Sequence, residues 1–180
     1  MEGPSDAQVV ARVLDGEIDA FGILVRRHSP ALARYAVRLL GNPDAADDVL
    51  AESFARAYRH LASCRDPDRF RTWVFRIVTN RCKSYLARRR LDAVSLDDAP
   101  PPVARSNPGL ELDRREAMAA VEWALGRLSV QRREAFVMKY VEGLSYEEMA
   151  EITGERVPTL KMRVHRAREA MARLLEERGL

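Results

Sequence analysis

A proline-rich segment divides this sequence into two parts. Residues 91–109 read LDAVSLDDAPPPVARSNPG, with four prolines and few apolar side chains from which a core could form. Because prolines favour an extended, semi-rigid chain, this composition is typical of an interdomain linker. The sequence therefore predicts two small domains, residues 1–90 and residues 110–180, joined by a link that spans distance without fixing orientation.

Apolar residues recur at helical spacing on both sides of this linker, and no alternating strand pattern persists beyond a few residues. The expected fold class is all-α. In the first part, caps, breakers and apolar periodicity predict helices over residues 6–14, 18–28, 30–39, 44–63 and 69–90. The fourth of these begins with several aspartates, which are favourable in a first helical turn.

The helix expected over residues 69–90 carries eight arginines and lysines and no acidic residue. Surface helices usually mix charges of both signs, so a polyanionic partner is indicated. Its apolar stripe, with Trp73 assigned to the core, predicts that an opposite side is exposed: Thr72, Arg76, Thr79, Asn80, Lys83 and Ser84. Cations beside short amide and hydroxyl side chains suit a phosphate backbone and base edges, so nucleic acid is the first hypothesis.

The second part predicts four helices that end in a helix-turn-helix. A helix over residues 110–128 is followed by one that Ser129 caps, and Ser145 with Glu148 forms a capping box for a short third helix. A turn at residues 153–156 and Pro158 then open a longer basic helix. In a helix-turn-helix the second helix enters the DNA major groove, whereas an ordinary helical hairpin with a solvated basic face remains the alternative.

Composition excludes several other classes of protein. The 180 residues carry a net charge of +3 and only two cysteines, Cys64 and Cys82, which excludes a disulfide framework and fits a reducing compartment. No apolar run approaches membrane-spanning length and no secretion signal begins the chain, so no membrane insertion and a cytoplasmic location are expected. His60 and Cys64 lack further ligands nearby, and no catalytic constellation is apparent, so neither metal, cofactor nor enzymatic activity is expected.

Three ordered segments carry a resemblance to a known family. They are RLLGNPDAADDVLAESFARAYRHL, FRTWVFRIVTNRCKSYLARRR and LSVQRREAFVMKYVEGLSYEEMAEITGERVPTLKMRVHRAREAMARLL, with the proline-rich linker between the second and the third. In this order, from about residue 18 to residue 175, the chain resembles the extracytoplasmic-function (ECF) sigma factors of bacterial RNA polymerase. The resemblance implies two helical domains, σ2 and σ4, and a function in promoter-specific transcription initiation.

The family pattern implies a role for each segment. Docking on the clamp helices of the polymerase β′ subunit would use Asp47, Asp48, Glu52, Ala55, Arg56 and Arg59. Recognition of the −10 element, melted to a single strand, would use the loop at residues 64–69 and six residues: Arg69, Arg76, Thr79, Asn80, Lys83 and Ser84. Reading the −35 element as duplex would use Thr159, Lys161, Met162, Arg163, His165 and Arg166.

The same resemblance implies further partners and some departures. Phe136, Val137 and Tyr140 would face the β-subunit flap, and an anti-sigma factor would regulate the protein. Family members commonly have glycine or serine at the position of Pro158, and serine at the position of Met162. The −35 sequence that relatives recognise therefore cannot be assigned to this protein. A stand-alone helix-turn-helix transcriptional regulator and a helical adaptor without a DNA role are the rival interpretations, but neither explains the one-sided basic helix together with the acidic one.

Overall fold

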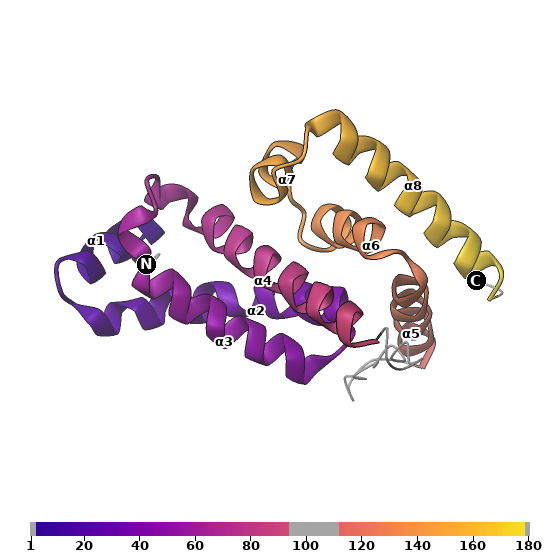
Figure 1. Ribbon diagram of the computed structural model, residues 1–180, viewed down its shortest axis with the longest axis horizontal. Coiled ribbons are helices and arrows are strands. Elements are labelled where there is room, and N and C mark those ends of the chain that lie inside the picture. The colour runs from indigo at the N-terminus through magenta and orange to yellow at the C-terminus, as the bar shows by residue number, and fades with distance from the viewer. Residues whose placement is uncertain (1–2, 94–111, 179–180) are drawn as a thin grey trace.

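The computed structural model describes residues 3–93 and 112–178, and every regular element in these ranges is helical. The first domain, residues 3–93, contains α1 (Asp6–Leu14), η1 (Ile18–Ala20), α2 (Phe21–Leu40), α3 (Pro43–Arg59), η2 (Leu61–Ser63), η3 (Pro67–Arg69) and α4 (Phe70–Ala93). The second domain, residues 112–178, contains α5 (Leu112–Arg127), α6 (Val130–Phe136), η4 (Val137–Val141), α7 (Tyr146–Thr153) and α8 (Val157–Glu176). The all-α fold class is therefore confirmed (Figure 1).

The first domain is a bundle in which α2, α3 and α4 lie side by side (Figure 1). Its core is built from side chains that are almost completely buried, among them Leu24, Leu32, Tyr35 and Phe75. Removing this apolar surface from water is the main favourable contribution to the stability of the bundle. The packing fixes α3 and α4 next to each other and leaves the outer face of each helix available for contacts.

The prediction of two helices over residues 18–39 is wrong, because α2 runs without a break and contains Pro30. An internal proline removes one backbone hydrogen bond and costs a helix about 3 kcal/mol. Residues on both sides of Pro30, such as Leu24 and Tyr35, are buried on the same helix, so tertiary packing of the whole length outweighs that local cost.

The capping and turn residues predicted for the second domain lie where its helices begin and end. The Ser145 hydroxyl accepts from the Glu148 amide at 3.1 Å and the Glu148 carboxylate accepts from the Ser145 amide at 2.7 Å, which confirms the capping box. Gly154 ends α7 with φ +76°, and Pro158 lies in the first turn of α8 as predicted. Ser129 precedes α6 as expected, but its side chain makes no capping hydrogen bond.

The helix after Ser129 is not regular over its whole length. It is α-helical only to Phe136 and then continues as a π-helical turn, η4. The amide of Glu142 donates to the carbonyl of Val137 at 3.0 Å, five residues earlier. Such turns hold one residue more than an α-helical turn, so they shift the direction in which the following side chains project.

The two domains pack against each other in this structure. The α7 helix contacts α4, while α5, α6 and η4 contact α2. The predicted linker falls almost entirely outside the described residues, so its expected extended form is not part of this picture. Within residues 3–93 and 112–178, no helix combines the length and the hydrophobicity that a membrane span requires.

Candidate nucleic-acid interface

The acidic helix α3 presents its predicted docking residues to solvent. All six are exposed: Asp47, Asp48, Glu52, Ala55, Arg56 and Arg59. Their positions follow from the buried stripe on the other side of the helix, which includes Val49, Phe54 and Ala57. Glu52 also forms an ion pair with Arg81 of α4, so the face combines carboxylates toward one end with cations toward the other.

One strip of α4 is open along three helical turns. Arg76, Asn80 and Ser84 are exposed and lie four residues apart, so they follow one another along the helix. Together with Arg56 and Trp73 they line a groove of about 430 Å³ between α3 and α4. This groove places a cation, an amide and a hydroxyl beside an aromatic ring, a combination that can hold a phosphate and a base.

Trp73 packs against the core of the first domain, as predicted, but also faces the grooves beside α4. It is half-buried, and its ring packs against Phe70 with 5.6 Å between the ring centroids. It also lines a second groove of about 680 Å³ whose wall includes Arg65, Asp66 and Arg76, so this groove joins the strip on α4 to the loop at residues 64–69. The apolar period alone did not reveal that Trp73 sits at the boundary of the stripe, where the bundle ends.

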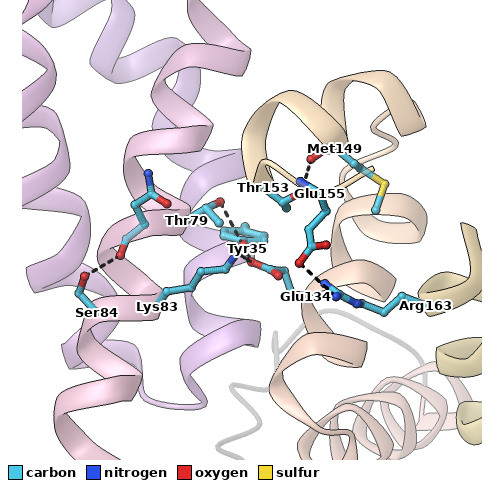
Figure 2. A network of polar contacts seen from close by, with 10 residues as sticks. Tyr35, Thr79, Lys83, Ser84, Glu134, Met149, Thr153, Glu155 and Arg163 are labelled. Atoms are coloured by element: carbon cyan, nitrogen blue, oxygen red, sulfur yellow. Dashed lines mark hydrogen bonds and ion pairs between the residues drawn. The ribbon is translucent and has the colours of Figure 1, made fainter. Parts of the chain in front are cut away.

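Of the other three predicted −10 residues, two pair with carboxylates of the second domain and one is buried within its own domain. Arg69 pairs with Glu151 of α7 at 2.7 Å, and the Lys83 ammonium lies 3.1 Å from Glu134 of α6. Thr79 is fully buried and donates a hydrogen bond to the Tyr35 hydroxyl at 3.1 Å (Figure 2). The expectation that Thr79 and Thr72 lie on an exposed face is therefore wrong in this arrangement, because both side chains are buried and the second domain packs along α4.

A buried carboxylate lies at the centre of these contacts. Glu134 is 3% exposed, and the Tyr35 hydroxyl donates a long hydrogen bond to it at 3.5 Å while Lys83 approaches from α4 (Figure 2). Burial raises the pKa of Glu134, and the charge of Lys83 opposes that rise. Sequence reasoning missed this residue, although Glu134 precedes the buried Met138 by four residues and so falls in the apolar phase of its helix.

The last helix, α8, presents most of its predicted reading residues. Thr159, Lys161, Met162, His165 and Arg166 are exposed near its start. Several of them line, with Gln131 and Arg132, an open groove of about 640 Å³. Opposite them, the buried side of α8 includes Leu160, Val164, Ala167 and Met171.

Arg163 differs from its neighbours on α8. Its side chain is only 17% exposed, and it pairs with Glu155 at the turn before the helix at 3.2 Å (Figure 2). This pair links the start of α8 to the preceding turn.

The surface predicted to face the β-subunit flap is only partly exposed. Tyr140 is exposed and packs on the half-buried Phe136, whereas Val137 is completely buried.

The two cysteines are buried free thiols. Burial raises the pKa of Cys64, and it raises the pKa of Cys82 to about 12, so both favour the unreactive protonated form. Among residues 3–93 and 112–178, no three His, Cys, Asp or Glu side chains gather closely enough to hold a metal ion.

Comparison with known proteins accounts for both domains. Family models for sigma-70 region 2 and sigma-70 region 4 match residues 24–91 and 118–171. RNA polymerase sigma-H factor of Pseudomonas aeruginosa is 33% identical, over 95% of this chain and 94% of its own length. RNA polymerase sigma factor CnrH of Cupriavidus metallidurans is 36% identical, over 96% of each chain.

Solved structures agree with these matches. Sigma factor RpoE of Bartonella quintana, in complex with the anti-sigma factor NepR, superposes with a TM-score of 0.76 and 27% identity over 88% of this chain and 98% of its own. CnrH in complex with the cytosolic domain of CnrY gives a TM-score of 0.71 and 30% identity over 97% and 99%. With both sigma-70 regions present in order and relatives aligned over nearly the whole length, the chain belongs to the ECF sigma factors of RNA polymerase.

Proposed function

We propose that this sigma factor uses three surfaces, one on each of α3, α4 and α8, to bind core polymerase and to recognise the promoter. The acidic face of α3 docks on the clamp helices of the polymerase β′ subunit. The groove beside Trp73, Arg76 and Asn80 holds the melted −10 strand, and the start of α8 reads the −35 duplex. The two domains are taken as residues 1–90 and 110–180 with a linker between them, although α4 continues to Ala93, three residues into the segment predicted as linker.

The observation that carries this proposal is the exposure of the α3 face. All six residues expected to dock on polymerase point to solvent, and five of the six are charged. Charged residues arranged in this way favour a partner of complementary charge and fix its register. The exposed strip on α4 and the exposed start of α8 supply two more surfaces, each basic enough to meet DNA.

The chain itself is expected to catalyse nothing, because the polymerase carries the chemistry of RNA synthesis. A sigma factor contributes binding energy for promoter choice and strand opening. The protein works with polymerase on the chromosome, so we place it in the cytoplasm, and we expect an anti-sigma factor as its regulator because the two solved relatives above include one in complex with such a factor.

The test is transcription by core polymerase from a defined start site in the presence of the purified protein. Asp48→Lys should weaken binding to core polymerase and reduce the transcript, because a cation then faces the basic surface of the partner. Asp15→Lys is the matched control, since Asp15 is also exposed but lies outside α3. Equal affinity of both variants and wild type for core polymerase would remove α3 as the docking surface.

A further inference from the structure

The ion pairs between the two domains share one polarity. Besides the Arg69 and Lys83 pairs, Arg38 of α2 meets Glu122 of α5 at 2.9 Å, and Arg34 of α2 meets Glu142 at 3.3 Å. In all four of these pairs, which join the described parts of the chain, the cation belongs to the first domain and the carboxylate to the second. The second domain therefore offers negative charges to α2, to α4 and to Arg69 at the end of η3.

Two of these pairs involve cations that the proposed function assigns to the −10 strand. Lys83 and Arg69 are held by carboxylates at distances of 3.1 and 2.7 Å, within the range of charge-assisted hydrogen bonds or close to it. The buried Thr79 is linked to one of them, because it donates to the Tyr35 hydroxyl and that hydroxyl donates to Glu134. The carboxylates of the second domain thus pair with the same cations that the phosphates of a DNA strand would otherwise bind.

We propose that the second domain masks the DNA-binding face of α4 in the free protein, by placing Glu134 and Glu151 on Lys83 and Arg69 as substitutes for DNA phosphates. This inference rests on the proposed function of α4. In the closed form the free chain binds single-stranded DNA weakly. Separation of the domains on the polymerase exposes the whole face at the stage when a melted strand becomes available.

The composition of the interface suits reversible closure. Arg69 and Glu151 retain 47% and 46% of their side-chain exposure, and Arg34 retains 51%. Exposed ion pairs contribute little individually and are screened by salt, so polymerase and DNA can replace them. Glu134 and Glu142 are almost completely buried in the closed form, so separation of the domains also returns these two carboxylates to water. Meanwhile the docking face of α3 and the start of α8 stay open, so the closed protein can still meet polymerase.

Closure is tested with the Arg38 and Glu122 pair, because neither residue belongs to the proposed DNA-binding set. In the full chain, fluorophores attached at Asp44→Cys and Arg173→Cys, both exposed positions, report the separation of the domains. The buried native thiols should label poorly. Glu122→Arg should lower energy transfer, and the swap Arg38→Glu with Glu122→Arg should restore it. High salt should lower transfer in the wild type.

Masking is tested in parallel, at one fixed ionic strength, by anisotropy of a labelled mixed-sequence single-stranded DNA. Opening by Glu122→Arg should tighten binding of the free chain about two- to fivefold, the range expected for loss of one ion pair, and the swap should reverse the gain. Glu134→Lys should lower energy transfer more than Glu122→Arg does, because it places two cations together in a buried site.

Each proposal has its own contrary result. Unchanged energy transfer for both single variants and in high salt would overturn closure through these pairs. Opening of the domains without tighter DNA binding would overturn masking.

These failures are distinguishable from failure of the proposed function. Transcription by core polymerase with Glu122→Arg should match the wild type, because the domains are already apart in that complex. If the wild type itself supports no transcription, the proposed function fails whatever the energy transfer shows. If transcription is normal but the free chain shows no opening with either single variant, only the masking proposal is lost.

Discussion

The two helices expected to meet DNA differ in how much of each is free. On α8, five of the six predicted reading residues are exposed, and the partners of Arg163 and His165, Glu155 and Glu169, belong to their own domain. On α4, by contrast, Lys83 is held by the other domain, and Thr79 is buried and donates to Tyr35 of its own domain. With the roles proposed above, domain closure would affect binding of the −10 strand and leave recognition of the −35 element unchanged.

The largest effect should come from the buried side of α8, on which its open side depends. Leu160→Ala should destabilise the second domain by about 2–5 kcal/mol, since Leu160 is 1% exposed and its loss leaves a cavity. The measurement is chemical denaturation followed by circular dichroism. Met162→Ala is the control, because Met162 is 53% exposed and its truncation should cost less than about 0.5 kcal/mol. Similar losses for both variants would contradict the assignment of the two faces.

The open face of α8 can be sharpened to individual bases. Arg166→Ala should cost about 1–3 kcal/mol of −35 binding and relax the preference at one base pair, as expected for a bidentate contact to guanine. Lys161→Ala should weaken all sequences alike and reduce the salt slope by about 0.9, because a lysine on phosphate carries no base information. Holoenzyme binding to all single −35 substitutions, at two salt concentrations, measures both. Full preference retained by Arg166→Ala would assign that residue to the backbone.

The two halves of the α4 face can be separated in the same way. Asn80→Ala and Lys83→Ala should both impair open-complex formation on duplex promoters, and a template mismatched over the −10 region should partly rescue both. Pre-melting removes an unstacking cost of a few kcal/mol. Only Lys83→Ala should also change energy transfer in the free chain, because Asn80 contacts solvent and Lys83 contacts Glu134. Equal defects on both templates would contradict a role in melting.

The smallest expected effect is a pH dependence of closure. The pKa of Glu134 is raised by burial in the closed form, so closing takes up a proton over the range just above the ordinary glutamate pKa of about 4.5. The charged or titratable groups facing it are Lys83, Arg163, Tyr35 and Cys82. Protonation of Glu134 therefore favours closure at low pH, and this contribution is lost as the pH rises through the raised pKa. Energy transfer measured from pH 4 to pH 7 should fall with rising pH, and Glu134→Gln should remove that part of the slope.

Sequence reasoning reached the fold because most of its signals are local. The capping box at Ser145, the position of Pro158 and the buried stripe of α8 each depend on residues within a few positions of one another. Pro30 was misread for the same reason, since its effect on α2 was decided by packing along the whole helix. Local sequence signals predict where helices form, but they say little about which other elements a helix packs against.

The candidate site shows the limit of such signals. Exposure of the α3 face and the start of α8 could be predicted, because each lies opposite a clear apolar stripe. Burial of Thr79 could not, since its hydroxyl bonds to Tyr35 of α2, which lies 44 residues earlier in the chain. Glu134 carried a weak signal as a carboxylate in an apolar phase, but nothing local indicated that Lys83 and Tyr35 would meet it.

The π-helical turn η4 has a consequence for insertions and deletions. It holds the extra residue that lets Val137 and Met138 both face the core while Glu142 still reaches Arg34. An α-helix advances by about 100° per residue, so deletion of one residue here would restore a regular helix and rotate everything after it by that angle. Chain length at this turn is therefore constrained more tightly than the identity of its exposed side chains, and a deletion should misdirect Glu142 even where the helix survives.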